Sequence, residues 1–252
     1  MTASIETILR TELQLGKWQT AFITALLRLM IALPGHATFR NLARNLARNL
    51  ARFSRYHERS FRRHFDKAIA WTTLNLALAE PTLQEPHELI LAIDCSFVPK
   101  SGRHTYGLDR FWNGVSSRHE RGLEVSLVAL VEPKTKRAFA LSAQQTAARR
   151  QQADATQQVE TPTASRTEQY LAHLRAVMPD VPERVRYVVA DGYYAKGTFI
   201  NGVEALNRHM VGRLRTDAHL RHLYTGPRTG KPGRPRLYAG KVGVHPLKWT
   251  GG

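Results

Sequence analysis

Two short apolar runs, each ending in an aspartate, constrain the fold of this chain more than any other feature. The first covers residues 89–94 (LILAID) and the second residues 185–191 (VRYVVAD). A continuous apolar run bounded by turn residues is typical of a strand buried on both faces of a sheet. An aspartate at the carboxyl end of such a strand lies where the sheet opens to solvent. If the two strands are neighbours, Asp94 and Asp191 can bind a divalent metal ion together.

The segments around these runs predict a mixed α+β fold. Residues 123–131 and 138–141 are apolar and flank a polar turn, which indicates an antiparallel hairpin. The other expected elements are a Gly- and Arg-rich connection at 101–122, a polar loop at 147–165, helices at 165–178 and 197–207, and a strand at 209–215. This order favours a mixed sheet with helices, in which the strands of Asp94 and Asp191 can lie side by side.

The amino-terminal third is predicted to be helical. Apolar residues recur every three to five positions in residues 4–33, and Pro34-Gly35 ends this pattern. Residues 41–52 repeat Asn-Leu-Ala-Arg three times, which places leucines and arginines on different faces of a helix. This helix is either an amphipathic surface helix or a direct DNA contact.

A basic stretch follows the repeats and carries Arg59, Arg62 and Arg63. The preceding repeat helix, a short break at 53–56 and a basic helix at 57–65 together make a helix-turn-helix candidate, whose arginines would contact DNA. A basic helical bundle that reads no sequence fits the same residues. Residues 66–83 continue as helix, and Pro81 and Pro86 indicate a linker.

The charge of the chain is strongly basic and unevenly distributed. Its formal net charge is +17, and an excess of this size usually means a polyanionic partner. Residues 1–70 carry 12 Lys and Arg against 4 acids, residues 71–181 carry 12 against 12, and residues 182–252 carry 13 against 4. The excess therefore lies at both ends, around a neutral centre.

Cysteine, histidine and apolar content exclude several other classes. The single Cys95 excludes an internal disulfide and is expected in the core, and the 11 histidines lack the paired spacing of a zinc site. The apolar run at 21–33 is too short to cross a membrane and contains Arg28. No export signal is expected either. The chain is therefore predicted to be cytoplasmic and associated with the nucleoid, with no membrane partner.

Phosphoryl transfer on nucleic acid needs an attacking oxygen and relief of charge on the phosphate, which divalent ions held by carboxylates supply. Asp94 and Asp191 are candidates for this role. The alternative for a single aspartate at a strand end is a solvated turn residue or a helix cap. The matched context of the two aspartates, in a chain this basic, favours the metal-binding interpretation.

Several motifs resemble those of bacterial insertion-sequence transposases of the Asp-Asp-Glu superfamily. They are residues 93–100 (IDCSFVPK), 106–114 (YGLDRFWNG), 141–146 (LSAQQT) and 189–196 (VADGYYAK). The resemblance extends from about residue 20 to residue 242. It implies a helical DNA-binding domain at 1–86 and an RNase H-like catalytic domain at 87–252. It also implies that Asp94 and Asp191 are the first and second catalytic acids, with Mg²⁺ or Mn²⁺ as cofactor and the double-stranded DNA of the element's ends and target as partner.

This sequence differs from that family at the third catalytic acid. The family's glutamate lies on a helix beyond an inserted segment that follows the strand at 211–215. Only Glu204 and Asp217 follow Asp191 here. Glu204 comes too early for the family's order, and Asp217 is expected in a turn. We therefore expect a chain shortened before its third acid, with a catalytic domain incomplete at its carboxyl end.

Three interpretations of the function follow. The first is a transposase that cleaves element ends and transfers strands, with Arg213, Arg215, Arg234 and Arg236 as further DNA contacts. The second is an inactive DNA-binding remnant or regulator, and the third is a structure-selective nuclease of the same fold. Residues 233–236 (GRPR) resemble a minor-groove hook, although a solvated basic loop fits them as well. A homodimer on DNA is compatible with the first interpretation.

Overall fold

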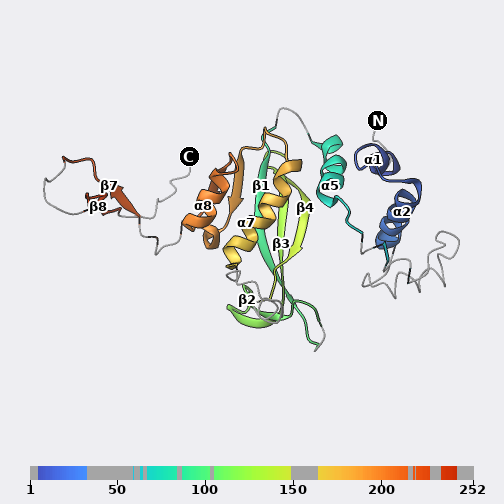
Figure 1. Ribbon diagram of the computed structural model, residues 1–252, viewed down its shortest axis with the longest axis horizontal. Helices are drawn as coiled ribbons and strands as arrows, with labels where there is room; N and C mark the ends of the chain where they lie inside the picture. Colours follow the sequence, from blue (N-terminus) through green and yellow to red (C-terminus); the bar gives the residue numbers. More distant parts are fainter. Residues whose placement is uncertain are drawn as a thin grey trace.

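The computed structural model describes residues 5–32, 59, 63–64, 67–83, 87–102, 105–148, 164–214, 218, 220–227 and 234–242 (Figure 1). Its helices are α1 (Ile5–Thr11), α2 (Lys17–Ala32), α5 (Trp71–Ala79), α7 (Arg166–Val177) and α8 (Gly197–Glu204), with short 3₁₀ helices η1 (Glu80–Thr82), η2 (Met178–Asp180) and η3 (Gly192–Tyr194). Its strands are β1 (Ile90–Pro99), β2 (Asp109–Asn113), β3 (Arg118–Glu132), β4 (Arg137–Gln145), β5 (Tyr187–Ala190), β6 (His209–Gly212), β7 (Arg221–Leu223) and β8 (Tyr238–Lys241).

A mixed sheet forms the centre of the molecule and confirms the mixed α+β class. β3 pairs antiparallel with β1 on one side, and its other partners are β4 along its later residues and β2 at its start. β5 is parallel to β1, and β6 is parallel to β5. The order β4-β3-β1-β5-β6, with α7 and α8 in the crossovers to β5 and β6, is that of an RNase H-like domain. The β3–β4 hairpin confirms the one expected from the two apolar runs.

The core lies between the sheet and helices α7 and α8, which Figure 1 shows in front of the strands. Alternate residues of the strands point to this core, including Leu91 and Ile93 of β1 and Val188 of β5. Residues between them, such as Ile90 and Ala92, stay partly exposed. The expectation that these strands are buried on both faces is therefore wrong, because within the described part of the chain α7 and α8 cover one face.

The two crossover helices are fixed by local sequence. Ser165 caps α7 through a capping box with Glu168. The apolar residues of α7 recur at helical spacing on its buried side: Tyr170, Leu171, Leu174 and Val177. α8 buries Phe199 and Val203 in the same core.

The amino-terminal residues form two helices rather than the single helix expected over 4–33. The chain leaves α1 at Thr11 and re-enters helix at Lys17. Gln14 between them has a φ of 51°, a conformation that ends a right-handed helix. The turn lets Leu9 of α1 and Phe22 of α2 share one buried cluster.

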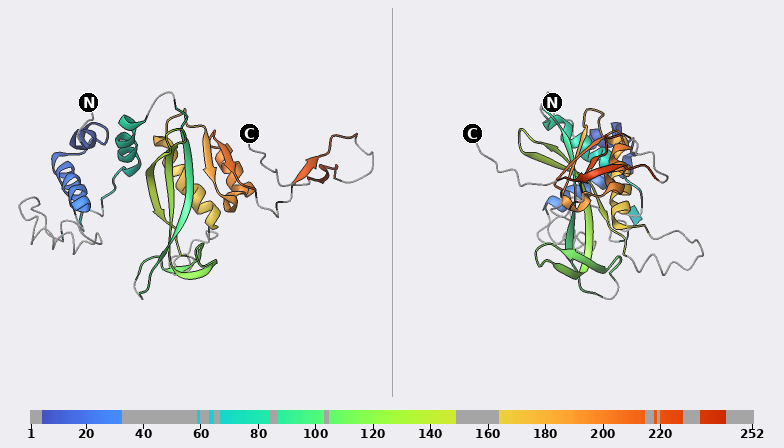
Figure 2. Two further views of the ribbon diagram at one scale, coloured as in Figure 1. Left: turned by 180° about the vertical axis from the view of Figure 1, so that it is seen from behind. Right: turned by 90° about the vertical axis from the view of Figure 1, so that its left-hand side faces the viewer.

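Helix α5 joins this helical cluster to the sheet (Figure 2). Its Leu74 is buried with α1 and α2, while Leu76 belongs to the core of the sheet. Asn75 also donates a hydrogen bond of 2.9 Å to the carbonyl oxygen of Leu141 in β4. The predicted domain boundary at residue 86 stays a prediction, and α5 packs against both parts.

Several predictions fall outside the described residues. These are the repeats at 41–52, Arg62, Arg215, Asp217, residues 228–233, and most of the helix-turn-helix candidate and of the loop at 147–165. Arg59 and Arg63 are described, are helical and are exposed.

Other predicted bounds differ from the structure. The segment at 101–122 contains strand β2 and the first residues of β3 instead of only a connection. Helix α5 begins at Trp71 and α8 ends at Glu204, so both are shorter than expected, as is β6, which ends at Gly212. β7 and β8 form a separate antiparallel hairpin that the sequence did not predict. No helix in the described ranges is long and apolar enough to span a bilayer.

Candidate catalytic site

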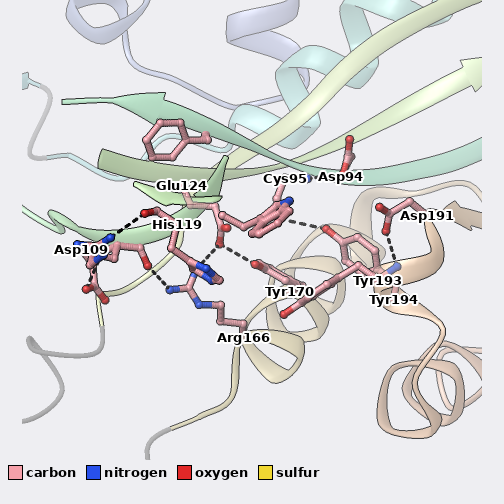
Figure 3. A pocket seen from close by; sticks show the side chains of 13 residues that line it. Asp94, Cys95, Asp109, His119, Glu124, Arg166, Tyr170, Asp191, Tyr193 and Tyr194 are labelled. Carbon is pink, nitrogen blue, oxygen red and sulfur yellow. Dashed lines mark hydrogen bonds and ion pairs between the residues drawn. The ribbon is translucent and has the colours of Figure 1, made fainter. Parts of the chain in front are cut away.

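Asp94 and Asp191 lie side by side because their strands are parallel neighbours. The register pairs Ile93 of β1 with Ala190 of β5, and each aspartate is the next residue along its strand. Figure 3 shows both side chains at the same end of the site. β5 ends at Ala190, as expected, but β1 continues to Pro99. Asp94 is therefore inside its strand and not at its end, because β3 extends the pairing of β1 beyond the last residue of β5.

Each aspartate uses one oxygen for a backbone hydrogen bond. Oδ1 of Asp94 accepts from the amide of Cys95 at 2.8 Å, and Oδ1 of Asp191 accepts from the amide of Tyr193 at 2.9 Å. The second bond caps η3, so the helix-cap interpretation of Asp191 is also correct. Both side chains remain exposed, and Oδ2 of each points to no hydrogen-bonding partner in the described part of the chain.

The electrostatics of the pair favour a cation. Although the side chain is exposed overall, partial desolvation of its carboxyl group, followed by the negative charge of Asp191, raises the pKa of Asp94 above its ordinary value, while the hydrogen bond from Cys95 acts in the opposite direction. Mg²⁺ prefers oxygen ligands and commonly uses one or two carboxylates while it keeps several waters. The two adjacent carboxylates fit such an ion. Within the described ranges, no group of three or more His, Cys, Asp or Glu side chains is placed to hold a metal.

A pocket of about 550 Å³ extends from the aspartates towards the β2–β3 hairpin. Figure 3 shows Asp94 and Asp191 at one end, Asp109 and His119 at the other, and Glu124, Arg166 and Tyr170 between them. None of these last five residues was expected at the site from the sequence. Asp109 and His119 come from β2 and the start of β3, in a segment that was expected to be a connection.

Glu124 forms a buried network on the floor of this pocket. Its Oε1 accepts a hydrogen bond of 2.6 Å from the hydroxyl of Tyr170 and pairs with Nη1 of Arg166 at 3.2 Å. The Arg166 guanidinium also lies 4.2 Å from the ring centroid of Phe111. These contacts, together with the burial of Glu124, assign this acid to the structure of the pocket rather than to a third metal-binding position. The only sequence signal was an acid at an inward-facing position of an apolar strand.

Cys95 packs against the core, as expected. Its thiol lies 3.1 Å from the hydroxyl of Tyr194, and burial raises the pKa of the thiol to about 11. The thiol is therefore protonated at neutral pH, which suits a packing role.

Of the predicted DNA-binding arginines that the structure describes, Arg213 lies nearest to the aspartates in the topology. It follows Gly212, which pairs with Ala190, so Arg213 and Asp191 occupy equivalent positions on neighbouring strands. The pocket is lined by neither Arg59, Arg63, Arg213, Arg234 nor Arg236. Arg236 instead donates to the carbonyl oxygens of Tyr238 and Ala239 in β8, and its guanidinium lies 5.1 Å from the ring centroid of Tyr224. Glu204, at the end of α8, does not line the pocket either.

Comparison with known proteins identifies the family. Residues 14–251 match the model of the DDE superfamily endonucleases, so the chain belongs to this family. Because the match reaches residue 251, the expectation that the likeness ends at residue 242 is wrong.

Among solved structures, the chain is similar to a piggyBac transposase, whose cryo-EM structure shows a synaptic complex with hairpin DNA. The sequence identity is 16%, the TM-score is 0.36, and the alignment covers 79% of this chain and 42% of that chain. This chain thus corresponds to less than half the length of the piggyBac chain. No curated protein matches significantly.

Proposed function

We propose that this chain is a DNA transposase that cleaves the ends of a mobile element and transfers the freed strands to target DNA. The observation that carries the proposal is the placement of Asp94 and Asp191 on adjacent parallel strands, in a member of the DDE superfamily endonucleases. An insertion-sequence element of a bacterium is the proposed substrate, and the cytoplasm, at the nucleoid, is the proposed location.

The proposed metal ligands are the exposed carboxylates of Asp94 and Asp191. Mg²⁺ or Mn²⁺ bound there would supply charge relief at the phosphate and lower the pKa of an attacking water. The backbone amides of Cys95 and Tyr193 hold one oxygen of each carboxylate and thereby orient the other. The fixed backbone of two paired strands keeps the carboxylates together before DNA binds.

The DNA would be held by basic residues on both sides of the sheet. Arg213 lies one strand away from Asp191, where an exposed guanidinium can bind a phosphate next to the one that reacts. Arg59, Arg62 and Arg63 are proposed to contact the element's ends from the helical part. Arg215, Arg234 and Arg236 are proposed to contact the backbone of the same DNA, on which two copies of the chain could assemble.

A second candidate function is a regulator or remnant that binds DNA without cutting it. The observation that favours it is that the described residues place only two carboxylates at the candidate metal site. The two candidates agree on DNA binding and differ on catalysis.

A cleavage assay separates these two candidates. The purified chain is incubated with a labelled element end, or with supercoiled plasmid, in Mg²⁺ or Mn²⁺. We expect cleavage by the wild type and a loss of at least about 100-fold in Asp94→Asn and Asp191→Asn, because a metal ion is worth several kcal/mol of transition-state stabilisation. Glu204→Gln, an exposed carboxylate outside the pocket, is the control and should cleave normally.

Other outcomes of this assay assign the chain differently. DNA binding without cleavage in either metal would contradict the transposase and leave the regulator. Cleavage that ignores the element's end and follows the shape of a DNA junction would indicate a structure-selective nuclease.

A further inference from the structure

The pocket beside the two aspartates contains aromatic rings that the metal-site chemistry does not use. Trp112 of β2 is 52% exposed and Tyr193 of η3 is 43% exposed, and both line the pocket. The neighbouring aromatic residues Phe111, Tyr170 and Tyr194 are buried instead. Large aromatic side chains that stay exposed inside a concave pocket mark a binding site.

Both exposed rings are held in place by neighbours. Trp112 packs edge-on against His119 with ring centroids 5.4 Å apart. Tyr193 packs edge-on against Tyr194 at 5.8 Å and carries the ammonium group of Lys196 3.8 Å from its ring centroid. The rings are therefore positioned before a ligand arrives, which reduces the entropy lost on binding.

The floor of the pocket is also preformed. The hydrogen bond from Tyr170 and the ion pair with Arg166 satisfy Glu124, and Nη2 of Arg166 reaches the carbonyl oxygen of Arg110 at 3.3 Å. The network joins α7 to β2 and β3, so it holds the hairpin that carries Trp112 against the rest of the domain. The guanidinium of Arg110 is exposed at the rim and donates to the carbonyl oxygen of His119.

The size of the pocket restricts what can enter it. Its volume of about 550 Å³ is within the range of about 300–1,000 Å³ found for small-ligand sites. A single nucleotide fits such a volume, whereas a base pair within a double helix does not. Every base has a flat π-face that stacks on aromatic side chains, and an exposed arginine at the rim can bind the adjoining phosphate.

We propose that this pocket binds one unstacked nucleotide of the DNA, next to the phosphate that lies at Asp94 and Asp191. The inference rests on the proposed function, because the aspartates and the exposed rings line the same pocket. The nucleotide can come from a single-stranded end or can be extruded from a duplex. In both cases its base stacks on Trp112 or Tyr193, and stacking of this kind tolerates any sequence.

The test is a binding measurement with three DNA probes of the same sequence. One is a fully paired duplex, one has a single-nucleotide bulge, and one has a short single-stranded overhang, with 2-aminopurine as the unpaired base. Ca²⁺ replaces Mg²⁺, and affinity is read by anisotropy. We expect the wild type to prefer the bulge or the overhang by about fivefold or more, and to quench the 2-aminopurine fluorescence. Preference for the bulge indicates extrusion, and preference for the overhang indicates capture of an end.

Substitutions of the two aromatic residues test whether their rings cause the preference for an unpaired nucleotide. Trp112→Ala and Tyr193→Ala should reduce the preference to less than about twofold, whereas Trp112→Phe should keep it, because a phenyl ring also stacks. Tyr106→Ala is the matched control, since Tyr106 is an exposed aromatic residue outside the pocket, and it should behave like the wild type. Thermal melting confirms that each variant is folded.

The proposal is overturned if the wild type binds the three probes equally or leaves the 2-aminopurine fluorescence unchanged in the complex. These two readouts need no variant, so an unfolded variant does not affect them. The result of the cleavage assay does not depend on the result of this binding measurement. A chain that cleaves DNA but shows no preference contradicts only the pocket, and a chain that shows the preference but never cleaves contradicts only the transposase.

Discussion

The carboxylate of Asp94 is partly desolvated and lies beside a second carboxylate, and both conditions disfavour its charged form. Its pKa is therefore higher in the folded chain than in the unfolded chain. A carboxyl group of this kind binds its proton more tightly when folded, so it favours folding at low pH. This contribution is lost as the pH rises through the raised pKa. At neutral pH the charged pair lowers stability until a cation binds.

The first stability prediction concerns Asp94→Asn. Without divalent ions at pH 7, this variant should melt at a higher temperature than the wild type, because it removes the charge repulsion but keeps an acceptor for the amide of Cys95. The difference should vanish as the pH falls towards the ordinary carboxyl value of 3.8. Mg²⁺ or Mn²⁺ at about 100 times its dissociation constant should stabilise the wild type by about 2.7 kcal/mol and the variant much less.

Melting curves over a pH series, with and without the ion, measure both effects. Glu204→Gln serves as the control and should respond to the ion as the wild type does. An equal response of the wild type and Asp94→Asn to Mg²⁺ would show that Asp94 does not hold the ion.

Asp94 and Asp191 could be predicted from sequence, whereas Glu124 could not. The two aspartates follow apolar runs of similar length, and strands of this type tend to pair in parallel within one sheet. Glu124 and its partners Tyr170 and Arg166 are 42 or more residues apart in the chain. Only the packing of α7 on β3 brings them together, and nothing local in the sequence indicates that contact.

At the scale of elements, the contact between α7 and α8 depends on a glycine. A Cβ atom on Gly202 of α8 would overlap the side chain of Leu171 of α7. The helices approach this closely because position 202 has no side chain. Phe199 and Val203 are thereby packed into the core that also contains Val188 of β5, the strand that precedes Asp191.

The element-scale prediction is that Gly202→Ala destabilises the protein although alanine favours helices. Helix propensity contributes about 1 kcal/mol in favour of the substitution, and overpacking against Leu171 costs about 1–3 kcal/mol. We expect a net loss of up to about 2 kcal/mol in the free energy of unfolding, measured by urea denaturation. Gly197→Ala, in the same helix with open space around it, should not destabilise the protein.

A double-mutant cycle tests the cause. Leu171→Ala alone should cost about 2–5 kcal/mol, but less when Gly202→Ala is present, because the new methyl group then occupies vacated space. Additive effects of the two substitutions would contradict a direct contact.

Helices and strands with a regular apolar pattern could be predicted from the sequence, and those without one could not. The β3–β4 hairpin and helix α7 have long apolar periodicities and, for α7, a capping box, and both were predicted. Strand β2 consists of Asp109–Asn113, with two charged residues and one buried phenylalanine, and its pairing with β3 decides its structure. The break between α1 and α2 falls at Gln14, whose side chain carries no signal for a positive φ. At β2, pairing with a neighbouring strand overrode local propensity.

At the scale of the molecule, the basic excess lies in the two ends of the sequence, whereas the candidate site carries two exposed carboxylates. The chain carries a formal net charge of +17, with excesses of +8 in residues 1–70 (12 minus 4) and +9 in residues 182–252 (13 minus 4). The two exposed aspartates lie in the middle of the sheet. This distribution attracts a polyanion to the flanks and leaves a cation to neutralise the centre. Binding to DNA should therefore weaken steeply with salt.

The last prediction tests whether Arg213 contacts a DNA phosphate, through the salt dependence of DNA binding. The logarithm of the DNA-binding constant should fall linearly with the logarithm of salt concentration, with a slope of about 0.9 for each phosphate contacted. Arg213→Ala should reduce that slope by about 0.9 on any DNA sequence, because an arginine that binds phosphate contributes affinity without sequence preference. Arg175→Ala, an exposed arginine in the last turn of α7, is the matched control and should leave the slope unchanged. Anisotropy titrations between about 50 and 200 mM salt measure both slopes. Equal slopes for Arg213→Ala and the wild type would show that Arg213 contacts no phosphate, which contradicts the proposal that it binds the phosphate next to the one that reacts.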